Sequence, residues 1–379
     1  MPYSGRRESA PPSRDRARKR VAVLGATGSI GGSALDVIGK NRDDFEVVLL
    51  CAHANGEGLA EAGRPWPDAV RVLGGGAGGR KRLLAAIADC GADIVVNGIS
   101  GAAGLEPSMA ALEAGSDLAL ANKETLVMAG PLVMRRALEK QARIIPVDSE
   151  HSAVFRLLEA HGPADEIILT ASGGPFRNST REEMAKAGPR DALAHPTWDM
   201  GAKISIDSAT MANKGLEVIE AAMLFGFPAG KIKVVVHPQS IVHSMIRMAD
   251  GAIYAQLSMP DMRLPIHQAL YLDDPRPTDL GRLDFDCLTL DFFPPDTERF
   301  PLLALAYDAA KKGGLYPCAY NAANEVAVSA FLAERIGFLD IARVTGYILG
   351  EDWSPEPAGM ADVMEADRRA RSMAEREIR

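Results

Sequence analysis

Short apolar segments alternate with helix-length segments over residues 21–148, and this alternation constrains the fold more than any other feature of the chain. Alternating strands and helices indicate an α/β fold with a Rossmann-like, doubly wound parallel sheet. Such sheets bind ligands at the carboxyl ends of their strands. We expect strands at 21–24, 46–51, 93–97, 118–121 and 144–147, and helices at 33–39, 83–88 and 107–114.

A glycine-rich turn joins the first expected strand to the first helix. Its residues are Gly25-Ala26-Thr27-Gly28-Ser29-Ile30-Gly31. Glycines let the backbone approach a pyrophosphate, and the N-terminus of a helix favours its negative charge. The spacing is G-x-x-G-x-x-G rather than the usual G-x-G-x-x-G, so a tight turn without a ligand is the alternative.

The end of the second expected strand discriminates between nicotinamide cofactors. An NAD site usually offers an acid there to the ribose 2′-hydroxyl group. This strand ends in Cys51-Ala52-His53-Ala54-Asn55, without an acid. The sequence therefore favours NADP, whose 2′-phosphate suits an uncharged or basic strand end.

Two carboxylates, Asp148 and Glu150, follow the expected strand 144–147. Positions i and i+2 of a strand share a face, so both side chains should point at one spot. That arrangement suits a hard divalent cation or a proton-transfer site, and two solvated acids are the alternative. Lys123 follows the strand 118–121, where it could polarise a carbonyl group; the alternative is a surface lysine with a buried stem.

Charge and composition exclude several classes of protein. The net charge of −8 argues against a general nucleic-acid-binding surface. No apolar run reaches the roughly 18–20 residues that a membrane span needs. The cysteines form no C-x-x-C pair, which argues against a disulfide framework or zinc site and fits a cytoplasmic protein. They are Cys51, Cys90, Cys287 and Cys318.

Three further long motifs occur besides the glycine-rich turn and the Asp148 segment. They are Leu120-Ala121-Asn122-Lys123-Glu124-Thr125, Ser172-Gly173-Gly174-Pro175-Phe176 and Ile206-Asp207-Ser208-Ala209-Thr210-Met211-Ala212-Asn213-Lys214-Gly215-Leu216-Glu217. In this order, the motifs together resemble the 1-deoxy-D-xylulose 5-phosphate reductoisomerase family over residues 21–364. The resemblance implies the NADPH- and metal-dependent rearrangement and reduction of 1-deoxy-D-xylulose 5-phosphate to 2-C-methyl-D-erythritol 4-phosphate in non-mevalonate isoprenoid biosynthesis. It also implies a homodimer that acts on a small phosphorylated sugar.

The resemblance also implies roles for individual residues. Spacing alone would make Lys214 and Glu217 an ordinary surface ion pair. The family pattern instead makes Asp148, Glu150 and Glu217 ligands of Mg²⁺ or Mn²⁺, with Co²⁺ as a further candidate, and Lys123 a catalytic residue beside them. The implied substrate contacts are Lys123, Ser149, Glu150, Ser172, His195, Trp198, Ser208, Asn213, Lys214 and Glu217. The implied cofactor contacts are Thr27, Gly28, Ser29, Ile30, Asn55, Asn122, Glu124 and Gly201.

Two segments call for separate treatment. Where the family often has a glycine followed by Lys, Arg or Ser before the Asn55 position, this chain has His53-Ala54. The contact to the 2′-phosphate is therefore open, with His53 and Arg64 as candidates. The Pro-bounded segment 190–200 contains His195 and Trp198 and predicts a lid over the substrate; a structural loop around Trp198 is the alternative.

We expect the chain to divide into segments of different kinds. The length suggests two or three domains, and the segment 63–79 is expected to be a loop. The expected parts are a disordered extension (1–20), an NADPH-binding domain (21–148), an α+β catalytic domain (149–272), a linker (273–301), a small C-terminal helical domain (302–365) and a charged tail (366–379).

Three other functions compete with this interpretation. A short-chain dehydrogenase would use a Y-x-x-x-K pair, which Tyr307 and Lys311 form. A semialdehyde-type dehydrogenase would need a cysteine beside a histidine, and no cysteine here falls in a motif. A non-catalytic NADPH sensor would have no use for three carboxylates and a lysine at strand ends.

Overall fold

The computed structural model describes residues 17–198, 200–272 and 274–379. Residues 1–16 of the expected extension, Asp199 of the expected lid and Asp273 at the start of the expected linker lie outside this range. Strand β1 (Lys19–Leu24) includes the last two residues assigned to the extension. Both residues contact distant segments: Lys19 Nζ donates a hydrogen bond to the Leu270 carbonyl at 2.7 Å, and Arg20 N–H donates to Asp93 at 2.7 Å.

Contacts within the chain group it into two compact units. The first unit contains the residues up to Asn122, together with Val133–Ser152 and Asp261–Gly281. The second contains Lys123–Leu132, Ala153–Pro260 and Arg282–Arg379. The domains expected from the sequence follow chain order and stay a prediction.

The first unit is built on a six-stranded parallel sheet with the order β3-β2-β1-β4-β5-β6. This order confirms the doubly wound α/β fold. Its strand β3 lies inside the segment 63–79 that was expected to be a loop. The strand is short, followed directly by three glycines and exposed at three of four positions, so its pattern is weak. The other strands are β2 (Phe45–Ala52), β4 (Ile94–Asn97), β5 (Asp117–Leu120) and β6 (Ile144–Pro146), and β3 spans Val70–Leu73.

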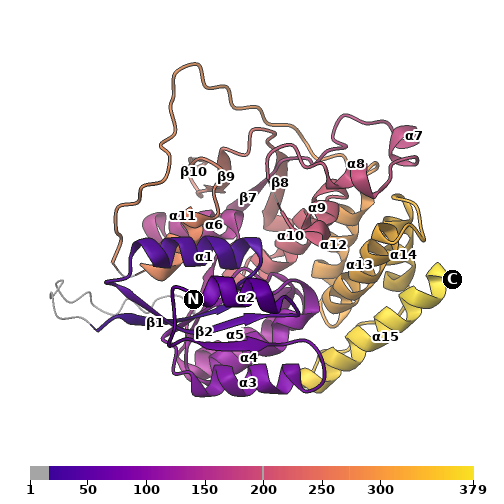
Figure 1. Ribbon diagram of the computed structural model, residues 1–379. Coiled ribbons are helices and arrows are strands. Elements are labelled where there is room, and N and C mark those ends of the chain that lie inside the picture. Colours follow the sequence, from indigo (N-terminus) through magenta and orange to yellow (C-terminus); the bar gives the residue numbers. More distant parts are fainter. Residues whose placement is uncertain (1–16, 199, 273) are drawn as a thin grey trace. The chain divides into compact units, whose positions relative to one another are not determined.

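Helices cover both faces of this sheet. Figure 1 shows α1 and α2 on one side, and α3 and α4 on the other. A late segment of the chain, α11, packs beside α1 and adds Ile266 and Leu270 to the apolar core under that helix. The helices are α1 (Ser29–Lys40), α2 (Gly56–Gly63), α3 (Gly79–Asp89), α4 (Leu105–Glu113) and α11 (Arg263–Leu270), with a 3-10 turn at Gly101–Gly104. Residues of α5 (Glu124–Lys140) and α6 (Ser149–His161) divide between the two units.

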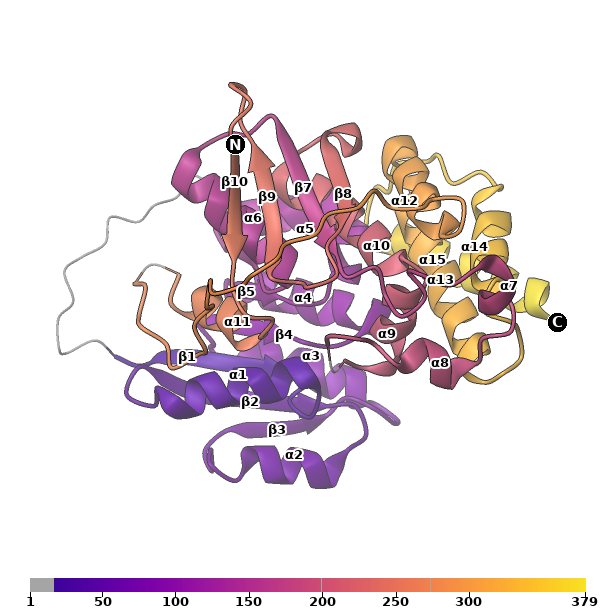
Figure 2. The same cartoon turned by 90° about the horizontal axis from the view of Figure 1, so that it is seen from above.

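The second unit contains a mixed sheet with the order β10-β9-β7-β8 (Figure 2). Strands β7 (Glu166–Ala171) and β8 (Ile232–Val236) are parallel, whereas β9 (Val242–Arg247) runs antiparallel to β7 and to β10 (Ile253–Leu257). Helix α10 (Ala212–Phe225) packs against β7 and β8. This unit is therefore of the expected α+β type.

The rest of the second unit consists of helices and of an extended segment that precedes the helix beginning at Pro301. Among the described residues 274–300 there is no helix, and only Phe293 pairs with a strand, at Val236. The other helices are α7 (Arg181–Met184), α8 (Pro189–Leu193), α9 (Ala202–Ala209), α12 (Pro301–Lys312), α13 (Tyr316–Leu332), α14 (Asp340–Leu349) and α15 (Met360–Ile378), with a 3-10 turn at Ala229–Lys231.

Residue 366, where the charged tail is expected to begin, lies within a helix. Helix α15 runs without interruption through this boundary and packs against α13 and α14. Val363, Ala366, Ala370 and Ala374 are buried along one face. Small apolar residues at spacings of three and four form a helix face that can approach a neighbour closely, although the helix as a whole is highly charged. No helix among the described residues has the length and apolar character to cross a membrane.

Candidate active site

The glycine-rich turn stands between β1 and α1, as expected. Gly25 has φ +79°, and a Cβ atom there would meet the Gly98 carbonyl oxygen at 2.8 Å. A Cβ atom at Gly31 would meet the Gly25 carbonyl oxygen at 2.3 Å. Both positions therefore require glycine. The turn holds Thr27, Gly28 and Ser29 exposed at the N-terminus of α1, where no side chain caps the helix.

An N-terminus of this kind is suited to an anion. The first backbone N–H groups of a helix lack intrahelical partners, and the helix dipole adds positive potential. Ile30, the fourth predicted cofactor contact of the turn, is half-buried in the first turn of α1. The geometry of the turn fits a diphosphate group.

The end of β2 carries no acid. His53 and Asn55 follow this strand and are exposed. The Asn55 side chain caps α2 by accepting a hydrogen bond from Gly58 N–H at 2.8 Å. Arg64 lies just after α2, exposed and paired with Glu61. Both candidates for a 2′-phosphate contact thus remain accessible.

A polar residue stands at the carboxyl end of β4, and another lies just beyond the carboxyl end of β5. The amide of Asn97, at the end of β4, donates to the Gly104 carbonyl at 2.9 Å and to Ser108 Oγ at 2.7 Å. Asn122, beyond β5, donates to the Gly101 carbonyl at 2.9 Å. Sequence reasoning missed Asn97, although a polar residue at the end of an apolar run was a usable signal. These bonds fix the loop at the carboxyl edge of the sheet.

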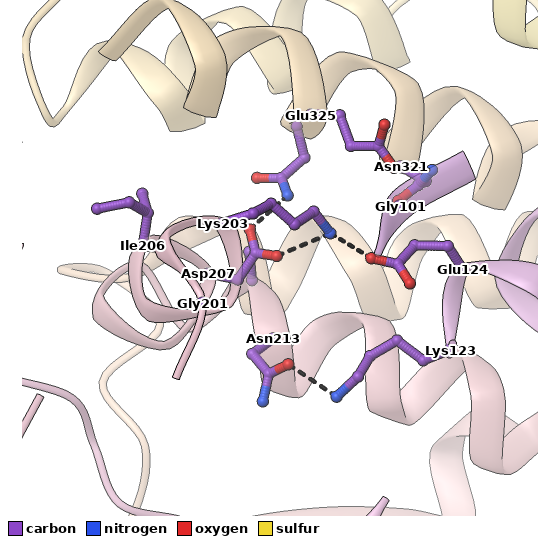
Figure 3. A network of polar contacts seen from close by, with 12 residues as sticks. Gly101, Lys123, Glu124, Gly201, Lys203, Ile206, Asp207, Asn213, Asn321 and Glu325 are labelled. Atoms are coloured by element: carbon purple, nitrogen blue, oxygen red, sulfur yellow. Dashed lines mark hydrogen bonds and ion pairs between the residues drawn. The ribbon is translucent and has the colours of Figure 1, made fainter. Parts of the chain in front are cut away.

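A buried group of charged residues lies at the start of α10 in the second unit. Lys123 Nζ lies 3.0 Å from Glu217 Oε1 and donates to Asn213 Oδ1 at 2.8 Å. Lys214 pairs with the other Glu217 oxygen, and Asn213 donates to Glu217 at 2.6 Å. Lys123, Lys214 and Glu217 are 4%, 3% and 0% exposed. Figure 3 shows Lys123 and Asn213 side by side.

This group bears on the alternatives that the sequence left open. Lys214 and Glu217 form a buried pair instead of the surface pair that spacing alone would suggest, because the helix face that carries them is packed inside the unit. Lys123 is likewise buried, which argues against a surface lysine. Two ammonium groups and one amide thus converge on one buried carboxylate, and an ammonium group held in this way can donate to an anionic oxygen of a substrate or of a transition state.

Asp148 and Glu150 do not lie on a strand. Strand β6 ends at Pro146 and α6 begins at Ser149, so the reason from strand alternation is wrong. The expected convergence is nevertheless found, because carboxylate oxygens of Asp148 and Glu150 lie within 4.8 Å of each other. The Asp148 carbonyl accepts from Ser152 N–H at 2.8 Å, which starts a helix instead of continuing the strand. Asp148, Ser149 and Glu150 are half-exposed, and Ser149 Oγ donates to the Glu150 carboxylate. Both carboxylates belong to the first unit, whereas Glu217 belongs to the second.

Ser172 and His195 contact each other beyond the end of β7. Ser172 Oγ lies 3.0 Å from His195 Nε2. His195 Nδ1 accepts from the N–H groups of Thr197 at 3.2 Å and Trp198 at 3.0 Å. Because Nδ1 accepts, Nε2 carries the proton of the neutral ring and donates to Ser172. Burial lowers the pKa of His195, in keeping with a neutral ring.

The expected lid is partly helical. Its first residues belong to α8, and the loop continues through His195 to Trp198, whose ring centroid lies 6.5 Å from that of His243. Gly201 is exposed and caps α9, and Ser208 is half-buried near the end of that helix. The mobility expected of this segment stays a prediction.

Glu124, a predicted cofactor contact, takes part in an ion pair. Lys203 Nζ lies 2.5 Å from Glu124 Oε1 and 2.9 Å from Asp207 Oδ2 (Figure 3). Burial acts to raise the pKa of Glu124, but Lys203 outweighs it and the pKa is lowered. Sequence reasoning missed Lys203 and Asp207, whose i, i+4 spacing on a helix was the only signal.

The tyrosine and three of the cysteines that the rival functions would use are buried or hydrogen-bonded elsewhere. Tyr307 donates its hydroxyl proton to the Ile232 carbonyl at 2.8 Å, and burial raises its pKa to about 12. Cys51, Cys90 and Cys318 are buried, and burial raises the pKa of Cys51 to about 11. Neither a tyrosine base nor an activated thiol is apparent among these residues.

Family models match most of the chain. The model of 1-deoxy-D-xylulose 5-phosphate reductoisomerase matches residues 21–75 and 75–130. Two models of the C-terminal domain of that enzyme match residues 144–225 and 257–373. A reductoisomerase of this name from Treponema denticola is 47% identical over 367 residues, which cover 94% of this chain and 96% of that protein.

The chain belongs to the 1-deoxy-D-xylulose 5-phosphate reductoisomerase family. A relative from Chlorobium phaeovibrioides is 48% identical over 94% of this chain and 98% of its own length. The reductoisomerase of Zymomonas mobilis, solved in complex with NADPH, has a TM-score of 0.86 at 42% identity over 96% of this chain and 99% of its own. A reductoisomerase solved in complex with NADPH, fosmidomycin and magnesium also has a TM-score of 0.86, at 36% sequence identity, over 95% of this chain and 98% of its own.

Proposed function

We propose that this chain converts 1-deoxy-D-xylulose 5-phosphate to 2-C-methyl-D-erythritol 4-phosphate, with NADPH as reductant and a divalent cation as cofactor. The match to the reductoisomerase family along nearly the whole chain carries this proposal. The buried group of Lys123, Asn213, Lys214 and Glu217 supports it. The short-chain dehydrogenase mechanism gains no support, because the Tyr307 hydroxyl donates its proton to a backbone carbonyl. The semialdehyde-type mechanism gains none from Cys51, Cys90 or Cys318, because these thiols are buried.

NADPH would bind at the carboxyl edge of the six-stranded sheet. Its diphosphate would lie on Thr27, Gly28, Ser29 and Ile30, where glycine admits the backbone and the helix dipole favours the charge. The bound cofactor supplies the hydride that reduces an aldehyde group. The other predicted contacts are Asn55, Asn122, Glu124 and Gly201, and His53 or Arg64 would contact the 2′-phosphate.

Asp148, Glu150 and Glu217 would hold the cation. Three carboxylates match Mg²⁺ or Mn²⁺, which prefer oxygen ligands, and Co²⁺ would also be accepted. Asp148 and Glu150 are half-exposed at the start of α6, so their oxygens are accessible. A bound cation acts as a Lewis acid toward two substrate oxygens.

The remaining polar residues would bind and orient the substrate. Lys123 would donate a hydrogen bond to the oxygen on which charge develops. Ser149 and Glu150 are further predicted contacts of the substrate. Asn213 and Lys214 present an amide and an ammonium group in the first turn of α10. Ser172, His195 and Ser208 would bind the phosphate group, and the loop that carries Trp198 would exclude water once it closes.

The oxidation of NADPH, followed by its absorbance, tests this proposal. We expect oxidation only when 1-deoxy-D-xylulose 5-phosphate and a divalent cation are both present. EDTA should stop the reaction, and excess Mg²⁺ or Mn²⁺ should restore it. Oxidation that is insensitive to EDTA, or that proceeds equally with unphosphorylated 1-deoxyxylulose, would contradict it.

We further propose that the protein is a cytoplasmic homodimer. Strand β10 is an edge strand that exposes Ile253 and Tyr254, 46% and 40% accessible, and such an edge is suited to cover by a second copy. All four cysteines are free thiols, as in reducing compartments. Light scattering of the purified protein should give twice the mass of 40.4 kDa.

A further inference from the structure

We propose that Lys203 is a positioning residue of the reaction, which holds the start of α5 and thereby orients Lys123. The inference rests on the proposed function, because Lys123 acts there as a catalytic residue. Glu124 follows Lys123 directly and is the first residue of α5. Its carboxylate oxygen Oε1 lies 2.5 Å from the ammonium group of Lys203.

The contact is formed inside the second unit. The side chains of Lys203, Glu124 and Asp207 are 19%, 7% and 2% exposed. An ion pair at such depth is screened little by water, and the loss of one member leaves an uncompensated buried charge. Lys203 therefore restricts where the Glu124 carboxylate can lie.

The anchor continues into the C-terminal helices. Asp207 Oδ1 accepts from the amide of Asn324 on α13 at 2.7 Å. Glu325, the next residue of α13, accepts from Arg371 of α15 at 2.7 Å, and Arg371 also pairs with Asp367 at 2.8 Å. Figure 3 shows Asp207 and Glu124 on opposite sides of the Lys203 ammonium group.

Charges around Lys203 favour its ionised form. Burial acts to lower the pKa of Lys203, but the carboxylates of Asp207, Glu124 and Glu325 outweigh burial and raise it. Lys203 thus stays a cation at any pH at which the enzyme works. It serves as a fixed counter-charge, while Lys123 contacts Asn213 and Glu217.

The position of the Lys123 ammonium group is closely defined by its contacts. Its Nζ atom contacts two partners on α10, at 2.8 and 3.0 Å, from a backbone that turns into α5 one residue later. A displacement of about 1 Å at a reacting group can cost about 100-fold in rate. A shift of Glu124 would be passed to Lys123 through a single peptide unit.

The test compares Lys203→Met with Lys203→Arg in the full-length holoenzyme. The Met variant should lower kcat by about 100-fold, while the KM for 1-deoxy-D-xylulose 5-phosphate changes by less than about three-fold. The Arg variant keeps the charge and should recover part of kcat. Lys231→Met is the matched control, because Lys231 pairs with Asp165 at 2.5 Å with both side chains about half exposed, and its kcat should match the wild type.

Hydrogen exchange supplies a readout that needs no substrate. In Lys203→Met, amides of residues 123–132 should exchange faster than in the wild type, and Lys231→Met should leave them unchanged. If the wild type fails to turn over 1-deoxy-D-xylulose 5-phosphate, the proposed function fails, and the exchange result still judges the anchoring of α5.

Three results would overturn the inference. The first is a kcat of Lys203→Met within about three-fold of the wild type. The second is a loss seen only in KM. The third applies if Lys203→Met does not fold. In that case Lys203→Arg is expected to have the stability, kcat and hydrogen exchange of the wild type if the ion pair serves folding alone. An unchanged kcat in Glu124→Gln would then complete the evidence against a role in catalysis.

Discussion

The ammonium group of Lys123 lies 3.0 Å from a carboxylate oxygen of Glu217, and the two side chains are 6% and 1% exposed. Lys214 contacts the other oxygen of the same carboxylate. One carboxylate therefore serves two buried cations. The stability and the proposed chemistry of the second unit both depend on it.

Substitutions of Glu217 and of Lys123 should have different effects on stability. Glu217→Gln removes the charge that both lysines contact, so we expect a loss of about 3–5 kcal/mol in the free energy of unfolding together with loss of activity. Lys123→Met leaves the Lys214–Glu217 pair in place and should unfold near the wild-type midpoint, but lose about 100- to 1,000-fold in kcat. Urea unfolding and steady-state kinetics measure both. Equal stability losses in the two variants would contradict this account.

The metal site can be tested at Glu150 without disturbing a buried ion pair. Glu150→Gln keeps the shape of a half-exposed side chain but removes its charge from the cation. We expect the variant to need much more Mg²⁺ for half-maximal activity, while its circular dichroism spectrum stays unchanged. Titration of activity with Mg²⁺ measures this. A wild-type Mg²⁺ dependence would remove Glu150 from the ligand set.

NADPH should be preferred over NADH, because no acid ends β2. Loss of the side chain that contacts the 2′-phosphate should cost about 1–3 kcal/mol in NADPH binding and leave NADH binding unchanged. His53→Ala and Arg64→Ala identify that side chain, since both residues are exposed near this strand end. Comparison of kcat/KM for the two cofactors is the measurement. A ratio near one in the wild type would refute the preference.

The loop that carries Trp198 should respond to acid. The folded pKa of His195 is lowered, so its stabilising effect is fully present above the unfolded value of about 6.5 and is lost as the pH falls through the folded pKa. Protonation places a hydrogen on Nδ1, which then can no longer accept from Thr197 and Trp198. Trp198 fluorescence should therefore change as the pH falls through the folded pKa of His195, which lies below the ordinary value of about 6.5. In a His195→Asn variant this transition should disappear; its persistence there would assign it to another group.

The sheet of the first unit could be predicted from the sequence because its strands are apolar and buried on both faces. Strand β3 was not predicted because a short, exposed edge strand that runs into a glycine-rich loop has little apolar pattern. The residues Asp148 and Glu150 were chosen for a reason that the structure contradicts, since the chain enters a helix at Ser149. Their carboxylate oxygens nevertheless lie within 4.8 Å of each other, so the expected convergence arises at the start of a helix instead of along a strand.

Spacing along one segment could not reveal burial or partners from distant segments. Lys214 and Glu217 have the spacing of a surface pair, and only the packing around α10 makes them a buried one. The contact between Glu124 and Lys203 joins positions 79 residues apart. Such contacts depend on how helices pack, and a local pattern contains no information on that packing.

The identity of the product tests the central claim most directly. Reduction alone would turn 1-deoxy-D-xylulose 5-phosphate into an unbranched 1-deoxypentitol 5-phosphate, whereas rearrangement followed by hydride transfer gives a branched carbon skeleton. Carbon-13 NMR of the product formed from uniformly labelled substrate, NADPH and Mg²⁺ distinguishes the two by the couplings between carbons. The account predicts 2-C-methyl-D-erythritol 4-phosphate, with a quaternary carbon coupled to three carbon neighbours. An unbranched polyol phosphate, or no product while NADPH stays bound, would contradict it.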